Sequence, residues 1–334
     1  MAHRLAGAPG GDDRAAVIDI GSNTIHLLVA DCSAGPMRQI CDRHVRAGLG
    51  IAVADGAPLG SERIREVASI VREFAAEARD RHALDVIVFG THAVRAAPDR
   101  AFLIEAIERE AMVAVQVLSP EQEAILCVAG ASLGPLPSPP FLCADIGGGS
   151  CDLAAVLVSG VCGVVSVSIG SGVLAAQDLG GDPPPASQVD QTAAMLDELF
   201  AATGFADQPG FSEMVVTGGA ARQLRRQIPV EPSTAALPAS ALFETVQRLL
   251  PALSAGWPCT VSPERAALVR AGGMILRAIM VRWRVSRWRV SPYGAREGAL
   301  VYRARGLSPD AAAPPAQHIL RPRDMEDTSG HPHA

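Results

Sequence analysis

The sequence contains no lysine, and each of its 29 basic residues is an arginine. This absence excludes reaction classes that depend on a lysine amine. A Walker P-loop and the protein kinases place a lysine on the phosphates, and pyridoxal enzymes form a Schiff base with one. An anion bound by this protein is therefore held by arginine, by backbone N–H groups or by a metal ion.

Aromatic residues and positive charge are also scarce. Aromatic residues make up 4% of the 334 residues, and the formal net charge is −6. Nucleic-acid-binding proteins usually carry a basic excess and aromatic surfaces on which bases stack. We therefore expect no nucleic-acid partner, whereas a phosphate ligand in a local, metal-assisted site stays open.

The sequence also lacks paired cysteines and long apolar runs. Its seven cysteines are odd in number, and none has the Cys-x-x-Cys spacing. We expect them to be small buried hydrophobic residues in a reducing cytosol. The first 14 residues have no signal-peptide apolar core, and no apolar run reaches the ~18 residues of a membrane helix. The sequence predicts a cytoplasmic protein without a membrane partner.

Apolar and polar residues alternate in a pattern typical of an α/β fold in both halves of the chain. Residues 134–140, rich in proline and glycine, are the best candidate linker. The expected divisions are a disordered segment 1–14, a first domain 15–133, the linker 134–140, a second domain 141–306 and a flexible tail 307–334.

Periodicity and capping signals place the elements within these domains. Ser61 is a candidate N-cap, and Ser119, Pro120 and Gln122 have the spacing of a capping box. Strands are expected at 15–20, 25–30, 85–89, 113–118, within 141–158, and at 162–169 and 213–217; helices are expected at 61–82, 101–110, from 120, and at 187–203, 239–250 and 263–284.

The two halves share a repeated pattern at an offset of 126 residues. When Asp19 is aligned with Asp145, Gly21 falls on Gly147 and Leu27 on Leu153. Each copy reads as a strand, an Asp-Ile-Gly turn and a second strand. The repeat predicts two domains of similar topology that face each other.

The glycine turns of this repeat are candidate phosphate sites. Gly147, Gly148 and Gly149 allow consecutive backbone amides to point at one anion. Side chains of Ser22, Asn23 and Ser150 could add donors. A dinucleotide-binding loop is rejected, because a strand rather than a helix follows. A plain hairpin turn remains the alternative for either copy alone.

Carboxylates flank the second turn and begin the helix after Ser119. Asp145 and Asp152 are hard oxygen ligands suited to Mg²⁺ or another divalent metal, with turn capping as the alternative. Glu123 could activate a water as general base, or could be an exposed residue favoured by the helix dipole. Glu121 points roughly 200° away at ~100° per residue, so only one of the two faces a given site.

One arginine follows a strand end, where α/β sheets place ligand groups. Arg95 lies shortly after the sequence Gly90-Thr-His. Its guanidinium could bind phosphate oxygens in a bidentate manner.

An ordered set of motifs now carries a family resemblance. The segments Ala16–Thr24, Gly90–Arg95, Ser119–Ala124, Ala144–Asp152, Val216–Gly219 and Val290–Gly298 resemble the exopolyphosphatase/guanosine pentaphosphate phosphohydrolase (Ppx/GppA) family in its short two-domain form, over about residues 15 to 305. The resemblance implies two actin-like (ASKHA, ribonuclease H-like) domains flanking a cleft, with the last helix able to pack back on the first domain. It also implies Mg²⁺-dependent release of terminal phosphate from inorganic polyphosphate or from guanosine pentaphosphate.

The resemblance assigns roles position by position. Glu123 matches the catalytic base, Arg95 the phosphate-binding arginine, and Asp145 with Asp152 the metal-side carboxylates. The expected phosphate-binding residues are Asp19, Gly21, Ser22, Asn23, Gly147, Gly148, Gly149, Ser150, Gly218 and Gly219.

The chain departs from the family pattern at four positions. Pro120, Ile125, Asp152 and Ala220 replace residues that are frequent in the family. Pro120 and the charge lost at Ile125 motivate a second hypothesis, a non-catalytic sensor of polyphosphate or guanosine tetra- or pentaphosphate. An actin-like sugar or acetate kinase fits the fold but has no recognisable substrate-side motif. The sequence does not choose between the two phosphate substrates, and it allows a homodimer without requiring one.

A duplicated pentapeptide is unrelated to these motifs. Arg282–Ser286 and Arg287–Ser291 both read Arg-Trp-Arg-Val-Ser. The repeat could form a basic rim that guides polyanions. The favoured interpretation is a helix end that runs into a last strand, with arginine stems covering apolar surface.

Overall fold

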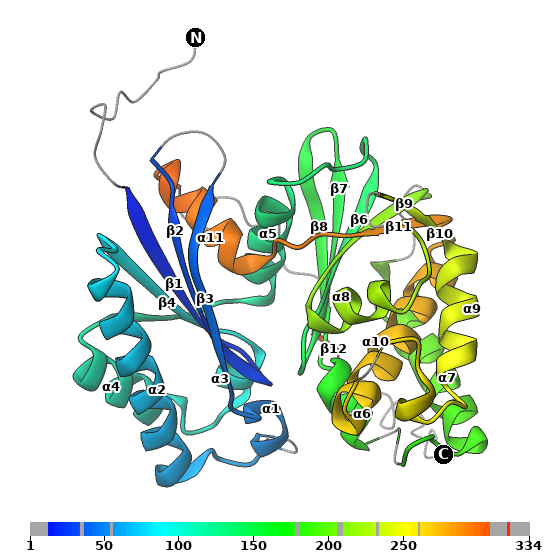
Figure 1. Cartoon of the computed structure of the whole chain (residues 1–334), viewed down its shortest axis with the longest axis horizontal. Helices are drawn as coiled ribbons and strands as arrows, with labels where there is room; N and C mark the ends of the chain where they lie inside the picture. The colour runs from blue at the N-terminus through cyan, green and yellow to red at the C-terminus, as the bar shows by residue number, and fades with distance from the viewer. Residues whose placement is uncertain are drawn as a thin grey trace, which may run out of the picture. The chain divides into compact units, whose positions relative to one another are not determined.

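The structure, a computed structural model, forms two compact units (Figure 1). It describes residues 13–33, 37–53, 56–177, 179, 181–205, 210–231, 234–259 and 261–307, and the backbone of residues 319 and 320. The first unit contains the described residues up to Val117 together with Ala299–Leu307; the second contains Leu118–Gly298 and β12. The chain thus divides at 117/118, and residues 134–140 lie within the second unit. The expected segment 1–14 and tail 307–334 fall almost wholly outside the described residues.

The first unit is a mixed sheet against which α2 packs. The strand order is β3-β2-β1-β4-β5, in which β4 and β5 run parallel to β1. Helices α2 and α4 pack on each other beside this sheet, as Figure 1 shows. The elements are β1 (Arg14–Ile20), β2 (Thr24–Asp31), β3 (Arg38–Arg46), α1 (Leu49–Ala52), α2 (Gly60–Asp80), β4 (Asp85–Gly90), α3 (His92–Ala96), α4 (Arg100–Ala111) and β5 (Val115–Val117).

The second unit repeats this topology and extends it. Its strand order is β10-β11-β9-β6-β7-β8-β12, and the stretch β8-β7-β6-β9-β11 matches β3-β2-β1-β4-β5. The elements are α5 (Pro120–Ala131), β6 (Phe141–Ile146), β7 (Cys151–Leu157), β8 (Gly160–Val167), α6 (Ser171–Gln177), α7 (Ala186–Ala201), β9 (Glu213–Thr217), α8 (Gly219–Arg226), β10 (Leu237–Pro238), α9 (Ala239–Leu249), the 3₁₀ helix η3 (Ser254–Gly256), α10 (Pro263–Arg282), β11 (Arg287–Val290), α11 (Ala295–Ala304) and β12 (Ile319–Leu320).

Two helix starts show where local sequence decides and where it does not. At α5, Ser119 and Gln122 form the predicted capping box, and Pro120 occupies the first turn. At α2, the prediction of Ser61 as N-cap is wrong, because the helix begins at Gly60. The carboxylate of Asp99 accepts the N–H groups of Leu59 and Gly60 at 3.0 and 2.9 Å. A cap from 39 residues away leaves no signal beside the helix it stabilises.

Helix α11 connects the units through the chain itself. It begins in the second unit, and its residues from Ala299 on belong to the first. There Arg303 donates to Asp13 at 2.8 Å and to Asp85 at 2.6 Å. These bonds hold the C-terminal part of α11 within the first unit, the segment for which packing on the first domain is expected.

The duplicated pentapeptide follows the favoured interpretation. Its first copy closes α10, and its second copy forms β11. Trp283 and Trp288 are both buried in the apolar core of the second unit. The tryptophans of the duplication therefore contribute to the core.

The cysteine expectation holds only in part. All seven thiols are free. Cys41, Cys127, Cys143 and Cys151 are buried, as expected, whereas Cys162 and Cys259 are exposed. Within the described residues, no helix combines the length and apolarity that a membrane span needs.

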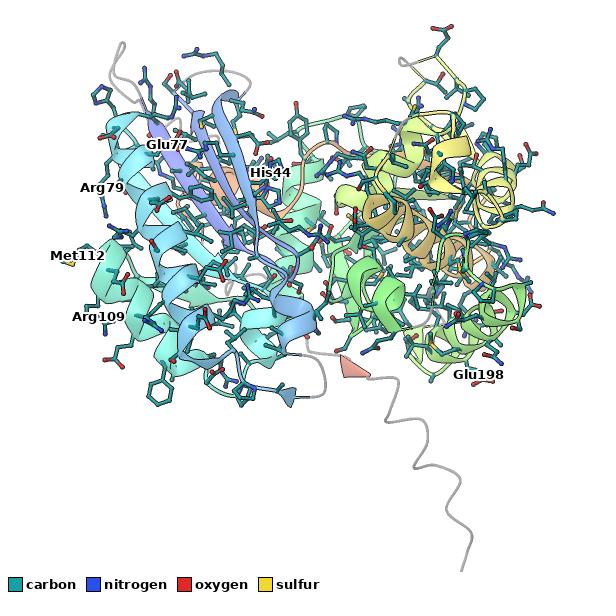
Figure 2. All side chains as sticks on the ribbon, turned by 60° about the horizontal axis from the view of Figure 1, so that its bottom comes forward. His44, Glu77, Arg79, Arg109, Met112 and Glu198 are labelled. Carbon is teal, nitrogen blue, oxygen red and sulfur yellow. The ribbon has the colours of Figure 1, made fainter. Side chains whose placement is uncertain are left out.

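Side chains on the surface of the first unit are shown in Figure 2. Arg79 of α2 donates to the carbonyl of Ala111 at 2.8 Å, where α4 ends in the left-handed residue Met112. This bond satisfies one of the carbonyls that a helix end leaves without a partner in the helix.

Candidate active site

The turn after β6 is the first part of the site. Gly147 N–H donates to the carbonyl of Ser150 at 3.1 Å, which closes a tight turn between β6 and β7. The corresponding turn after β1 is closed in the same way, by Gly21 N–H and the carbonyl of Thr24 at 3.2 Å. The sequence repeat is therefore a structural repeat of two like turns.

The back of the second turn is held by the start of α6. The carbonyl of Gly147 accepts Ser171 N–H at 2.9 Å, and that of Gly148 accepts the N–H groups of Gly172 and Val173 at 2.9 and 3.0 Å. These bonds turn the carbonyls toward α6. Among the described residues, no backbone acceptor takes the N–H of Gly148 or Gly149. Amides left in this arrangement suit an anion.

Glycine is required where the turn meets α6. A Cβ on Gly170 would lie 2.5 Å from the carbonyl carbon of Gly148, and one on Gly172 would lie 2.8 Å from the Gly148 oxygen. Both neighbours are backbone atoms and cannot rotate away. The turn therefore packs directly on the backbone at the start of α6, which fixes the positions of its amides.

The turn of the first unit is supported similarly, from the start of α1. The carbonyl of Ser22 accepts Gly50 N–H at 2.7 Å, and that of Asn23 accepts the N–H groups of Ala47 and Gly48 at 3.0 and 3.1 Å. The pattern Gly-x-Gly follows the third strand in each unit, at Gly48–Gly50 and Gly170–Gly172. This repeated signal was available in the sequence, but sequence reasoning missed it.

Two carboxylates lie side by side next to the second turn. Asp145 and Asp152 are direct partners across the antiparallel β6–β7 ladder, so their side chains share one face. Ser150 Oγ donates to Asp152 Oδ2 at 3.1 Å, and Thr217 Oγ1 donates to Asp145 Oδ1. Asp152 and Thr217 are buried. Each carboxylate is thus held by a hydroxyl of its own unit, and Thr217 is a contact that the sequence-based set of site residues did not include.

A third carboxylate of the candidate site comes from α5. Glu123, 6% exposed, lies one turn before Cys127 on a helix packed on β6, β7 and β8. Burial is the main reason that the pKa of the Cys127 thiol lies well above its usual 9.0. The charges of Asp145, Glu123 and Asp152 raise that pKa further, so all three carboxylates act on one sulfur. Glu121 is half-buried.

The loop after β9 holds the last predicted site residues of this unit, Gly218 and Gly219. Gly218 adopts φ 102°, and a Cβ there would lie 2.3 Å from the carbonyl oxygen of Ile146. Only glycine allows this approach, so the loop abuts the end of β6 directly. The amide of Gly219 then opens α8.

The remaining predicted residues lie in the first unit, at or just after the carboxyl ends of β1 and β4. Asp19 stands near the end of β1, and its Oδ1 lies 3.9 Å from where a Gly21 Cβ would be. Thr91 N–H donates to the carbonyl of Ile20 at 3.2 Å, and this bond connects the start of α3 to the end of β1. Arg95 lies one turn further along α3.

The donor set of the second unit fits a hard divalent cation. Among the described residues, no group of three or more His, Cys, Asp or Glu side chains is arranged to hold a metal ion. Mg²⁺ keeps several waters and usually takes only one or two protein carboxylates together with substrate phosphates. Asp145 and Asp152, adjacent and with hydroxyl support, meet that requirement.

The motifs and geometry above agree with one family, and residues 28–305 match its sequence model. The chain belongs to the Ppx/GppA phosphatase family. It is similar to "Exopolyphosphatase 1" of Mycobacterium tuberculosis, with 27% identity over 310 residues that cover 86% of this chain and 87% of that protein.

Solved structures of other Ppx/GppA proteins share the fold. The Aquifex aeolicus family member aligns with a TM-score of 0.75 at 24% identity, over 89% of this chain and 99% of that one. An exopolyphosphatase from Cytophaga hutchinsonii aligns with a TM-score of 0.78 at 20% identity, also over 89% and 99%. The predicted fold class, two actin-like α/β domains, is confirmed, and the protein is a phosphatase of this family.

Proposed function

We propose that this protein is an exopolyphosphatase, which hydrolyses the terminal phosphoanhydride bond of inorganic polyphosphate and releases orthophosphate. One observation carries the proposal: the buried Glu123 lies in the same neighbourhood as Asp145 and Asp152, which flank a turn whose Gly148 and Gly149 amides take no backbone acceptor among the described residues. The names of the similar curated proteins supply the substrate.

The residues of the second unit would act on the terminal phosphate. The N–H groups of Gly148 and Gly149 would bind its oxygens, and Glu123 would accept a proton from the attacking water. The water oxygen would form a bond to the terminal phosphorus. The bond from that phosphorus to the bridging oxygen would break, and the bridging oxygen would leave with the shortened chain. Mg²⁺ held by Asp145 and Asp152 would neutralise phosphate charge when bound.

The residues of the first unit are assigned to binding rather than bond breaking. Arg95 would bind phosphate oxygens in place of the absent lysine, and the amides of the Gly21–Asn23 turn would add donors. The pattern around Asp19 matches the turn of the second unit, which supports a common phosphate-binding role. Ser22 and Asn23 remain proposed side-chain donors, as do the amides of Gly218 and Gly219 in the other unit.

Three of the four departures from the family pattern have structural explanations, which weakens the case for the sensor hypothesis. Ile125 is only 4% exposed, where a buried charge would be costly, and Pro120 stabilises the first turn of α5. A Cβ on Gly272 would lie 2.6 Å from the Ala220 Cβ, so a small residue at 220 matches its neighbour. Guanosine pentaphosphate presents the same terminal phosphates and is tested as an alternative substrate.

The decisive experiment replaces Glu123 by Gln and measures phosphate release. We expect kcat on polyphosphate to fall by at least about a hundredfold, since general-base catalysis contributes about that much or more. Glu121→Gln is the matched control, with the same change two residues earlier, and its rate stays near that of wild type. Polyphosphates of graded length and guanosine pentaphosphate are compared, each with Mg²⁺ and with EDTA.

Two results would contradict this proposal. Wild-type turnover by the Glu123→Gln variant would remove Glu123 from the mechanism. Tight polyphosphate binding by the wild-type protein, with no phosphate release under any divalent metal, would identify a sensor instead.

A further inference from the structure

A hydrogen bond beneath the carboxylate pair leads beyond the proposed function. Thr217, the last residue of β9, is fully buried. It is the direct partner of Asp145 across the parallel β6–β9 ladder, and its Oγ1 donates to Asp145 Oδ1. One oxygen of the Asp145 carboxylate is therefore held from the adjacent strand β9 by a hydroxyl that water does not reach.

Two other buried threonines of the same unit use their hydroxyls differently. Thr192 donates to the carbonyl of Gln188 at 2.7 Å, and Thr203 to that of Phe200 at 2.8 Å. Both bonds stay within one helix and its end, where they satisfy a local backbone group. Thr217 instead bonds a side chain 72 residues away.

Among its described residues, the first unit has no such carboxylate pair, and the residues beside its aspartate, Asp19, differ accordingly. Asp19, the counterpart of Asp145, has Phe89 as its partner on the parallel strand and His26 on the antiparallel strand. Asp145 has Thr217 and Asp152 in those two places. The hydroxyl and the second carboxylate thus occur together in one unit and are both missing from the other.

We infer that Thr217 is a positioning residue, which fixes the orientation of the Asp145 carboxylate for a divalent cation. A side chain that donates to a ligating carboxylate holds it in one rotamer, and loss of such a partner typically weakens metal binding by about 10–100-fold. Thr217 also immediately precedes the glycine pair 218–219. One residue therefore sets the carboxylate and the start of the phosphate loop relative to each other. The inference rests on the proposed function only in assigning the cation to Asp145.

The test measures cation binding directly, on the full chain and without turnover. Mn²⁺ is titrated into the wild-type protein and the Thr217→Val, Thr217→Ser and Thr192→Val variants, and free Mn²⁺ is followed by electron paramagnetic resonance. Valine keeps the branched shape and loses the donor, whereas serine keeps the donor. We expect an affinity about 10–100-fold weaker for Thr217→Val. Thr217→Ser should stay within about threefold of wild type, because a charged hydrogen bond is retained.

Thr192→Val is the matched control, because it removes from the same unit a buried threonine hydroxyl that donates to the backbone carbonyl of Gln188. Its Mn²⁺ affinity should equal that of wild type. Thermal unfolding of each variant is followed by circular dichroism, and Thr217→Ala replaces Thr217→Val if the valine variant does not fold. In phosphate-release assays, Thr217→Val should show a raised Mg²⁺ activation constant, with kcat largely recovered at saturating Mg²⁺.

The outcomes separate this inference from the proposed function. Equal Mn²⁺ affinity of wild type and Thr217→Val would overturn the positioning role, as would the absence of Mn²⁺ binding by wild type. A protein that binds Mn²⁺ in the expected order of affinities but releases no phosphate would support the positioning role and overturn the hydrolase proposal.

Discussion

The two units build the same turn but place different side chains around it. Both turns close through a glycine N–H, and both are supported by amides from a Gly-x-Gly segment after the third strand. Around Asp145 stand Asp152 and Thr217, while around Asp19 stand His26 and Phe89. His26 has a further neighbour in His44, labelled in Figure 2, with ring centroids 5.6 Å apart. The fold thus supplies two like turns, and of these two only the turn of the second unit has a pair of carboxylates beside it.

The largest effect should separate the two aspartates. Asp145→Asn removes a proposed cation ligand and should lower kcat by more than about a hundredfold, beyond what loss of a supporting partner costs. Asp19→Asn removes a carboxylate with no acidic partner opposite it and should leave Mn²⁺ affinity unchanged. Mn²⁺ titration and phosphate release on both variants measure the contrast. Equal loss of cation binding in the two variants would show that the units do not differ in this respect.

A smaller effect should distinguish how rigidly each turn is supported. Gly170→Ala brings a methyl group to 2.5 Å from backbone of the turn, whereas Gly50→Ala brings one to 2.9 Å from the Ser22 Cβ. A side chain can shift more easily than backbone, so Gly170→Ala should destabilise more, by about 1–3 kcal/mol as in other overpacked sites. Urea unfolding measures the free energies. A larger loss for Gly50→Ala would reverse the order of rigidity proposed for the two turns.

The smallest effect concerns how a helix begins in each unit. Burial alone would raise the pKa of Asp99, but the N–H groups of Gly60 and Leu59 outweigh it and hold the pKa below its usual 3.8. Asp99→Asn should cost about 1 kcal/mol at neutral pH, which is typical of a lost cap. A lowered pKa stabilises the fold above the unfolded-state value, and the gain is lost as pH falls through the folded-state value.

The matched change in the second unit is Ser119→Ala at α5. It removes an uncharged cap and should cost a similar amount that does not change between pH 6 and pH 3. Urea unfolding of both variants at several pH values checks this. A constant difference between wild type and Asp99→Asn down to the lowest pH would refute the charged-cap explanation.

Much of the fold could be predicted from the sequence because its signals are local. The capping box at Ser119 and the Asp-Ile-Gly turns depend on residues within a few positions of each other. Strand β3 went unpredicted, since six of its nine residues are exposed and it shows little apolar alternation. The cap by Asp99 and the bond from Thr217 to Asp145 join distant residues, so only the three-dimensional register shows them.

The contact between α5 and the start of α11 has a mechanical consequence for catalysis. A Cβ on Gly130 would lie 2.0 Å from the carbonyl oxygen of Gly294, and one on Gly298 would lie 1.9 Å from that of Leu126. The two helices therefore cross backbone to backbone at a pivot, and Glu123 sits about 10 Å along α5 from it. Over that arm, a tilt of about 5° would move Glu123 by about 1 Å, a displacement that can cost about a hundredfold in rate. The glycines of this crossing thereby help to fix the position of Glu123 from about two turns away on α5.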